Sequence, residues 1–333
     1  MSNAPSAAVG PGPAGPDPAQ LDAAVAALAG RRVAVLTGAG VSTDSGIPDY
    51  RGEGAPVRRP MTFQQFLADE RFRKRYWAGS HVGWRTFRAA RPNDGHRALA
   101  ELERRGVTNG VVTQNVDALH VRAGSQRVVD LHGTVDRVVC LTCGQSFARE
   151  TVARRLSDAN PWIDDPDEVV LAPDGDVEVQ DVDAFVVPEC TVCGGVLKPD
   201  VVFFGEFVPV ERFAEARALV VRADALLVAG SSLVVNSGVR LLDQAVRRGK
   251  PVVVVNRGAT KGDPRATVKV DAGTTETLVA LLGRLPATGD AARGDREPHD
   301  GATTDGATTD GAAGLAADRR SADRPARGAG GAA

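Results

Sequence analysis

Apolar and polar positions along the chain form two recurring patterns. Short runs rich in Val and Leu are typical of buried strands, and each run ends in a loop of small or polar residues. Between them, apolar residues recur three and four positions apart, which is the spacing of an amphipathic helix. We predict strands within 31–40, 110–120, 128–133, 223–235 and 250–258. We predict helices over 21–30, 96–106, 211–223 and 237–249. This alternation predicts an α/β fold with a Rossmann-like, doubly wound parallel sheet covered by helices on both faces.

The pattern breaks down in three segments, and these suggest the domain organisation. Residues 137–200 contain all four cysteines of the chain and an acidic, Pro-containing stretch, so we predict a small inserted domain there. Residues 1–20 are mostly Ala, Pro and Gly, and residues 286–333 carry the repeat DGATTDGATTDGAA. Both ends have too little apolar surface to offset the entropy of ordering, so we predict disorder. The α/β domain would then consist of 21–136 and 201–285.

Charge and hydropathy exclude some classes of partner. The net charge of the 333-residue chain is −2, whereas a nucleic-acid-binding surface needs a basic balance. No apolar run approaches the roughly 20 residues of a membrane span. The first residues show neither the basic nor the apolar region of a secretory signal, so we expect a cytoplasmic protein without direct nucleic-acid or membrane partners.

Four loops follow the carboxyl ends of predicted strands, where open α/β sheets bind ligands. The loop 37–52, TGAGVSTDSGIPDYRG, has small residues that let the backbone approach a phosphate. It departs from the G-x-G-x-x-G fingerprint, because position 43 is Thr, so a hydride-transfer site is not expected. The loops 113–117, 230–233 and 256–258 complete the set. Together they favour a nucleotide site, although Asn and Ser in such loops can also simply cap helices.

The cysteines form two pairs, Cys140-x-x-Cys143 and Cys190-x-x-Cys193, and each pair is followed by Gly. Four thiolates suit a tetrahedral Zn²⁺ ion with no open position, so we predict one structural zinc per chain. Redox motifs or a disulfide are the alternatives. A redox motif would need a thioredoxin-like context, which the sequence lacks.

Among the five histidines, His132 is the candidate for chemistry. It ends the predicted strand VVDL and precedes Gly133 at the ligand-binding edge of the sheet, and His suits general-base chemistry near neutral pH. His96 and His120 fall on helical patterns, where structural roles are expected.

Taken together, GAGVSTDSGIPDYRG, TQNVDALH, LHG, the paired C-x-x-C, LKPDVVFFGE, GSSL and NRG resemble the sirtuin family of NAD-dependent protein deacylases. The resemblance spans about 22–284, and YWAGSHVGW is similar to the class II branch. It implies an NAD-binding Rossmann-like domain, a zinc-binding small domain and a substrate cleft between them. The implied reaction converts acyl-lysine and NAD into lysine, nicotinamide and 2′-O-acyl-ADP-ribose.

The resemblance also implies roles for individual residues. His132 would act as the general base on the ribose hydroxyls, and activity would fall at pH 6–7 if its pKa is ordinary. Asn115 would orient the ribose and a water molecule. The implied NAD-binding residues are Gly38, Ala39, Gly40, Ser42, Thr43, Ile47, Pro48, Asp49, Tyr50, Arg51, Gln114, Asn115, Val116, Asp117, Gly230, Ser231, Ser232, Asn256, Arg257, Gly258 and Thr274.

On the substrate side, the resemblance implies recognition through the backbone. The carbonyl of Val202 would accept a hydrogen bond from the acyl-lysine Nε–H, and the substrate would add a strand between Gly205–Glu206 and a strand at Val234–Val235. Phe203 and Phe204 would form core and pocket wall. Position 50 is Tyr where the family often has Phe, and 164–183 is an acidic insertion that we interpret as a solvated loop.

Three functions stay open at this point. The first is an NAD-dependent protein-lysine deacetylase or deacylase acting on acylated proteins, and the second is a protein ADP-ribosyltransferase. The third is a non-catalytic NAD-binding protein, which the presence of Asn115, Asp117 and His132 argues against.

Overall fold

A parallel six-stranded sheet organises the computed structural model, which describes residues 15–49, 60–163 and 182–287. Its strand order is β3-β2-β1-β7-β8-β9, which makes it the doubly wound parallel sheet predicted from the sequence, with β9 as a strand that was not predicted. The strands are β1 Val33–Thr37, β2 Thr108–Thr113, β3 Val128–Asp130, β7 Ala225–Ala229, β8 Val252–Val255 and β9 Val268–Val270. Every residue of β1, β7 and β8 is buried, because helices cover both faces of the sheet.

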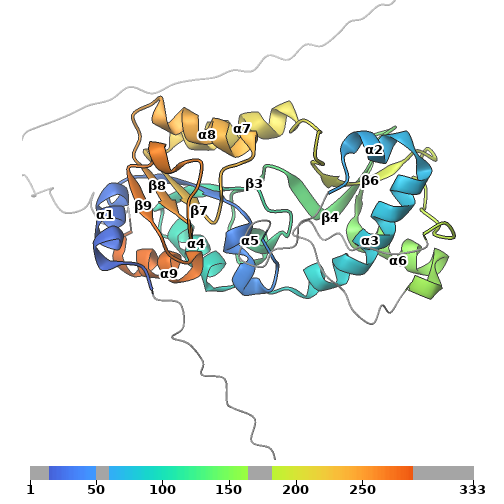
Figure 1. Ribbon diagram of the computed structural model, residues 1–333, viewed down its shortest axis with the longest axis horizontal. Helices are drawn as coiled ribbons and strands as arrows, with labels where there is room; N and C mark the ends of the chain where they lie inside the picture. Colours follow the sequence, from blue (N-terminus) through green and yellow to red (C-terminus); the bar gives the residue numbers. More distant parts are fainter. Residues whose placement is uncertain (1–14, 50–59, 164–181, 288–333) are drawn as a thin grey trace, which may run out of the picture. The chain divides into compact units, whose positions relative to one another are not determined.

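Two groups of helices cover the sheet, and alternate residues of β1 show this directly. Val33 and Val35 pack with α1, α4 and α9, whereas Ala34 and Leu36 pack with α7 and α8 (Figure 1). The helices are α1 Pro18–Leu28, α4 Asp94–Arg104, α5 Leu119–Arg122, α7 Val210–Arg222, α8 Asn236–Val246 and α9 Thr274–Arg284. Three-residue 3₁₀ turns occur at η1 Ala39–Val41, η2 Thr43–Ser45, η3 Pro161–Ile163 and η4 Asp263–Arg265.

Local capping explains where the predicted helices begin. The side chain of Asp17 accepts a hydrogen bond from the backbone N–H of Gln20, and Pro18 takes the first helical position of α1. The helix therefore starts inside the segment 1–20, so the prediction of disorder was wrong from Pro18 onward. Asn93 caps α4 in the same way by accepting from the N–H of His96, which starts this helix earlier than predicted.

The four cysteines belong to a second group of elements. A three-stranded antiparallel sheet, in the order β5-β4-β6, consists of β4 Gly133–Cys140, β5 Ser146–Ala148 and β6 Leu197–Val201, with α6 Arg149–Ala159 beside it. The helices α2 Phe63–Ala68 and α3 Glu70–Ala89 share one hydrophobic core with these elements, at the right of Figure 1. The prediction assigned 63–89 to the α/β domain, and this packing does not support that part of the division. Both groups of elements lie within one compact unit, Met1–Gly294.

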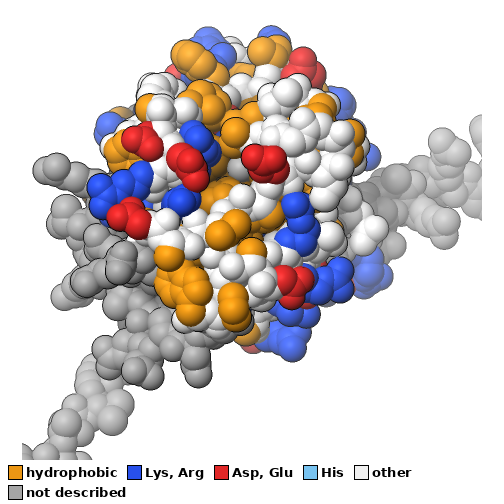
Figure 2. Space-filling model, turned by 90° about the vertical axis from the view of Figure 1, so that its right-hand side faces the viewer, with side chains coloured by type: hydrophobic (Ala, Val, Ile, Leu, Met, Phe, Trp, Pro, Cys, Tyr) orange, Lys and Arg blue, Asp and Glu red, His pale blue; other side chains and the backbone are white. Residues whose placement is uncertain are grey.

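Several predictions fall outside the described residues. Residues 1–14, most of the acidic insertion and the tail from position 288 are among them. Within the described ranges, none of the helices combines the length and hydropathy that crossing a membrane requires. Figure 2 faces the end of the unit that carries α3 and α6, and it shows acidic and basic side chains beside hydrophobic ones.

Candidate active site

Three glycines form a backbone cradle where the strand order of the sheet reverses. Gly38 follows β1, and Gly230 follows the neighbouring strand β7. A Cβ atom on Gly38 would lie 2.7 Å from the carbonyl oxygen of Gly230, and one on Gly40 would lie 2.9 Å from the Gly230 Cα. Only glycines permit this close approach, and the absence of their side chains leaves room for a pyrophosphate. The backbone N–H groups of Gly38, Gly40 and Gly230 themselves donate to the carbonyls of Ala229, Gly230 and Val255. The cradle therefore fits the phosphates of a dinucleotide.

A cavity of about 1370 Å³ opens from this cradle. Most of the predicted site residues line this cavity, although they come from loops far apart in the sequence. The predicted residues that line it are Gly38, Ala39, Gly40, Ser42, Thr43, Ile47, Asp49, Gln114, Asn115, Val116, Asp117, His132, Val202, Phe203, Gly205, Glu206, Gly230, Ser231, Ser232, Val235, Asn256, Arg257, Gly258 and Thr274. Pro48 is not part of the lining, and Tyr50 and Arg51 lie outside the described residues.

The floor of the cavity is a hydrogen-bonded polar network. The Asn115 side chain donates to the carbonyl of Gly38 at 3.1 Å and to the hydroxyl of Ser42 at 3.0 Å. The Ser42 hydroxyl in turn donates to the Asp117 carboxylate, whose other oxygen accepts from the backbone N–H of Leu119. Burial raises the pKa of Asp117, and these two donors act in the opposite direction. The network fixes polar groups on which a carboxamide or a ribose can dock.

Two buried imidazoles lie behind this floor. The Nδ1 of His96 lies 3.0 Å from the Asn93 side-chain oxygen, and its Nε2 lies 3.5 Å from the hydroxyl of Ser42. The ring of His120 lies 4.8 Å from that of His96, and its Nε2 is 2.9 Å from the Thr37 hydroxyl. Burial lowers the pKa of His96 to about 4 and that of His120 well below its ordinary value, so both rings are neutral at neutral pH.

His132 lies at the end of β3 with both ring nitrogens hydrogen-bonded. Its Nδ1 is 3.0 Å from the carbonyl oxygen of Gln114, and because a carbonyl only accepts, Nδ1 carries the hydrogen. Nε2 therefore accepts from the hydroxyl of Ser237 at 2.8 Å. Burial lowers the pKa of His132 to about 4, the Gln114 carbonyl raises it, and the charge of Arg212 lowers it further. The expected loss of activity at pH 6–7 assumed an ordinary pKa, and burial moves this loss to lower pH.

Several residues of the cavity were not predicted from the sequence. Ser237, in the first turn of α8, is a direct partner of His132, and Tyr76, Met61 and Arg240 line the cavity. Ser237 and Arg240 follow the loop 230–233, which was already a candidate, so extending that loop into the next helix would have found them. Tyr76 lies on α3, and nothing in its local sequence indicates that α3 reaches the cavity.

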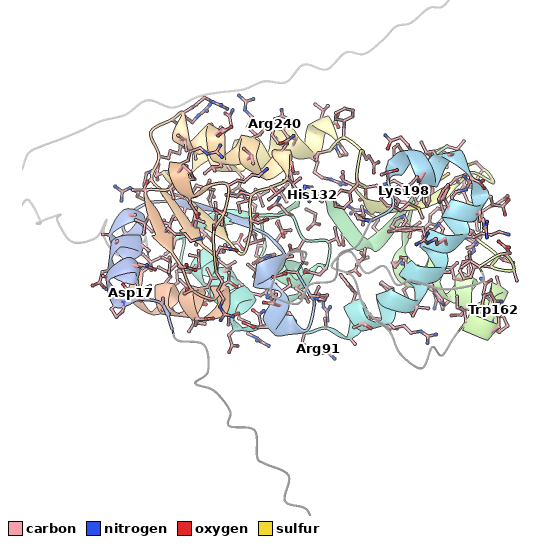
Figure 3. All side chains as sticks on the ribbon, in the orientation of Figure 1. Asp17, Arg91, His132, Trp162, Lys198 and Arg240 are labelled. Atoms are coloured by element: carbon pink, nitrogen blue, oxygen red, sulfur yellow. The ribbon has the colours of Figure 1, made fainter. Side chains whose placement is uncertain are left out.

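The predicted substrate segment runs beside His132. The backbone N–H of Val202 donates to the carbonyl of His132 at 2.8 Å. The Glu206 carboxylate accepts from the backbone N–H of Phe203 at 2.8 Å and from the buried Lys198 ammonium at 3.0 Å. Figure 3 shows His132 and Lys198 on neighbouring parts of the fold. The turn that follows β6 is thus held rigidly next to His132.

The opposite side of the cavity differs from the prediction. Val234 and Val235 do not form a strand, because β7 ends at Ala229 and α8 begins at Asn236. Val235 is the residue before α8 and has an extended backbone, with φ −82° and ψ 129°, so it retains the conformation that pairs with an added strand. The two phenylalanines agree with the prediction: Phe203 is buried, Phe204 is half-exposed, and both line the cavity.

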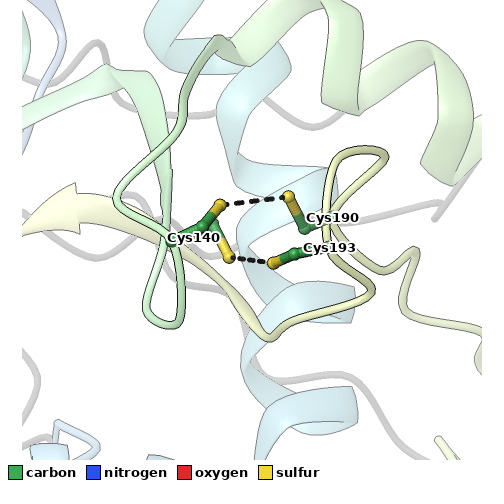
Figure 4. A group of neighbouring side chains, drawn as sticks. Cys140, Cys190 and Cys193 are labelled. Atoms are coloured by element: carbon green, nitrogen blue, oxygen red, sulfur yellow. Dashed lines mark hydrogen bonds between the residues drawn. The ribbon is translucent and has the colours of Figure 1, made fainter. Parts of the chain in front are cut away.

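The cysteine pairs meet at the ends of two loops (Figure 4). Their four Sγ atoms all lie within 4.8 Å of one another. The Cys140–Cys193 separation is 3.5 Å and the Cys143–Cys190 separation is 3.8 Å, both far longer than a disulfide bond of about 2.05 Å. A tetrahedral zinc ion with bonds of about 2.3 Å places its sulfur atoms about 3.8 Å apart. The geometry fits the predicted structural zinc.

Backbone N–H groups donate to the sulfur atoms of Cys140 and Cys190. Hydrogen bonds from the backbone of Cys143 and Thr142 lower the pKa of Cys140 to about 6, with the Cys143 contribution the larger. The backbone N–H of Val192 lies 3.4 Å from the Cys190 sulfur. Because zinc binds thiolates, groups that stabilise the negative charge also favour the metal.

The fold and the cavity define a nucleotide-binding α/β protein with an added four-cysteine domain. Residues 38–237 match the Sir2 family. The chain belongs to this family, as the motifs of its sequence indicate.

Named relatives extend over the same region. The chain is 53% identical over 265 residues to the NAD-dependent protein deacetylase 1 of Mycobacterium avium (strain 104), covering 78% of this chain and 94% of that protein. It is 54% identical over 271 residues to the NAD-dependent protein deacetylase 1 of Streptomyces coelicolor, covering 80% and 90%. A solved structure described as "Sir2-p53 peptide-NAD+" is 33% identical, covers 76% of this chain and 92% of its own, and has a TM-score of 0.62. A structure of Sir2Tm bound to a propionylated peptide has a TM-score of 0.60 at 32% identity, covering 76% and 92%.

Proposed function

We propose that this chain is an NAD-dependent protein-lysine deacylase that transfers the acyl group of lysine to ADP-ribose and releases nicotinamide. One observation carries the proposal: a neutral imidazole, His132, lies on the same cavity as the glycine cradle and the Val202 segment. The deacetylase names of relatives at about half identity support it.

The cradle of Gly38, Gly40 and Gly230 would hold the pyrophosphate of NAD, and the network of Ser42, Asn115 and Asp117 would receive the nicotinamide ribose and the carboxamide. Ser231, Asn256, Arg257 and Thr274 line the cavity and would contact the adenosine side. When bound, NAD supplies the ribose carbon to which the acyl oxygen is transferred.

His132 would act as the general base toward a ribose hydroxyl. Its Nε2 has a lone pair, because the Gln114 carbonyl holds the hydrogen on Nδ1. The Ser237 hydroxyl donates a hydrogen bond to this lone pair, and a ribose hydroxyl would replace it as the donor. A lowered pKa keeps the base unprotonated across the neutral range.

The substrate would be a segment of an acylated protein in extended conformation. The Val202 carbonyl would accept the acyl-lysine Nε–H, and the segment would add a strand between Gly205–Glu206 and Val234–Val235. The names of structures with p53 and propionylated peptides support this class of partner. The four cysteines would hold zinc in a structural role, since four thiolates leave no coordination position for a substrate.

The test is a product analysis with NAD and a panel of acyl-lysine peptides of increasing chain length. We expect nicotinamide, free lysine and 2′-O-acyl-ADP-ribose in equal amounts, and loss of all three in His132→Ala. NAD labelled in its adenosine would end in the small-molecule fraction. Label on protein without deacylated peptide would instead establish an ADP-ribosyltransferase, and no NAD consumption with any peptide would overturn the deacylase.

A further inference from the structure

The carboxylate of Asp200 contacts side chains from two other elements of the fold, close to His132. Asp200, on β6, accepts from Arg212 on α7 at 3.0 and 3.1 Å, through both of its oxygens. It also accepts from the Nε of Arg137, on β4, at 2.7 Å. Because α7 covers the large sheet while β4 and β6 belong to the cysteine-containing part, this carboxylate joins the two parts.

The same residues support the backbone at His132. Gly133 has a φ of +86°, and a Cβ atom there would lie 1.8 Å from the carbonyl oxygen of Asp200 and 3.1 Å from an Arg212 nitrogen. The N–H of Val202 donates to the carbonyl of His132. The turn at His132–Gly133 thus packs against the segment 200–202.

The side chains of this cluster are largely shielded from solvent. Those of Arg212 and Asp200 are 19% and 17% exposed, whereas that of Arg137 is 46% exposed. The charge of Arg212 is therefore weakly screened, and it adds to the effect of burial in lowering the pKa of His132. Burial raises the pKa of nearby Asp130 to about 6, against the charges of Arg137 and Arg212. The charged groups that act in this environment include the carboxylates of Asp117, Asp130, Asp200 and Glu206, the guanidinium groups of Arg137 and Arg212, and the ammonium of Lys198.

We propose that Arg212 is a positioning residue for the reaction at His132: its pair with Asp200 holds the His132–Gly133 turn against β6. This inference rests on the proposed deacylase function. The charge of Arg212 adds a second effect on the His132 ring, which experiment can separate from the geometric one.

The test compares Arg212→Met, which removes the charge, with Arg212→Lys, which keeps it. Arg137→Met is the matched control, because Arg137 contacts the same Asp200 carboxylate but has a more exposed side chain. We expect kcat for an acetyl-lysine peptide to fall about tenfold in Arg212→Met, as for the loss of a charged hydrogen bond. The acidic limb of its kcat/KM profile should move to higher pH. Arg212→Lys should lose part of kcat without moving the limb, and Arg137→Met should keep both near wild type.

A second readout does not depend on turnover. The His132 ring signal in an NMR titration, assigned by its loss in His132→Ala, should titrate at higher pH in Arg212→Met. The double variant Arg212→Met/Asp200→Asn removes both charges and should bring the titration back toward wild type. An unchanged titration in a folded Arg212→Met protein would overturn the inference. A wild-type protein that consumes no NAD would overturn the proposed function instead, while the titration would still decide the role of Arg212.

Discussion

Ser42 donates a 2.7 Å hydrogen bond to the carboxylate of Asp117, and the two residues lie 75 positions apart in the sequence. Ser42 follows the turn η1 behind β1, and Asp117 follows β2, so the pair joins the ends of two neighbouring parallel strands. Asn115 donates to the same hydroxyl. The Ser42 hydroxyl therefore connects the glycine cradle to the polar floor of the cavity.

Replacing Ser42 by Ala should weaken this floor without unfolding the protein. The change leaves one Asp117 oxygen without its donor and Asn115 without one acceptor, a loss of about 1.5–3 kcal/mol for a charged hydrogen bond. We expect kcat/KM for NAD to fall about 10- to 100-fold. Steady-state kinetics at saturating peptide measure this. Ser45→Ala, on the adjoining turn and away from the cavity lining, should match wild type, and equal losses in both variants would contradict the assignment.

Asp130 should destabilise the protein at neutral pH. Burial raises its pKa from 3.8 to about 6, so the folded protein binds this proton more tightly than the unfolded chain does. The cost of the ionised carboxylate is then fully present above about pH 6, and it disappears as the pH falls toward 3.8. Asp130→Asn should raise the free energy of unfolding by about 1–3 kcal/mol at pH 7.5. Denaturant unfolding at pH 7.5 and 4.5 tests this, and an equal gain at both values would contradict it.

Gly38 provides a test of the cradle. Its φ of −137° is open to any residue, so alanine there adds no backbone strain and acts only through its Cβ, 2.7 Å from the Gly230 carbonyl. We expect Gly38→Ala to lower NAD affinity at least tenfold and to destabilise the fold by about 1–3 kcal/mol through overpacking. Calorimetric titration with NAD and thermal unfolding measure the two effects. Gly283→Ala has open space around its Cβ and lies in α9, so it should keep NAD affinity and slightly raise stability, and similar losses in both variants would contradict the cradle.

The strands and their loops could be predicted because their signals are local. β1, β7 and β8 are continuous apolar runs, and in a parallel sheet every loop at their carboxyl ends reaches the same edge. The cradle, Asn115, Asp117 and His132 therefore come together without any knowledge of long-range packing. The roles expected for these residues come from their resemblance to the motifs of the family.

Contacts between distant elements could not be predicted in this way. The middle of α3 is buried on all sides, from Tyr76 to Trp84, and its local sequence does not identify the partners. The indole N–H of Trp77, for example, donates to the carbonyl of Leu197, 120 positions later. Ser237 meets His132 across 105 positions. Burial by such distant elements lowers the pKa of His132, so the ordinary pKa of histidine does not predict the pH at which its ring is protonated.

The zinc site should control the folding of one part of the protein, and the tryptophans can report this. All three tryptophans, Trp77, Trp84 and Trp162, lie in the elements that pack with the four-cysteine domain: the first two are in its core, and Trp162 contacts Phe185 of that core. We expect about one zinc per chain by metal analysis. Chelation, or the substitution Cys143→Ser, should shift tryptophan emission to longer wavelength, since binding energy in such sites is folding energy.

Added Zn²⁺ should reverse the effect of the chelator, and added Mg²⁺ should not, because a hard cation does not bind four thiolates. Ser146→Ala, on the exposed strand between the two cysteine pairs, serves as the control and should keep both zinc and emission. A chelated protein with unchanged emission and full activity would show that these four cysteines need no metal.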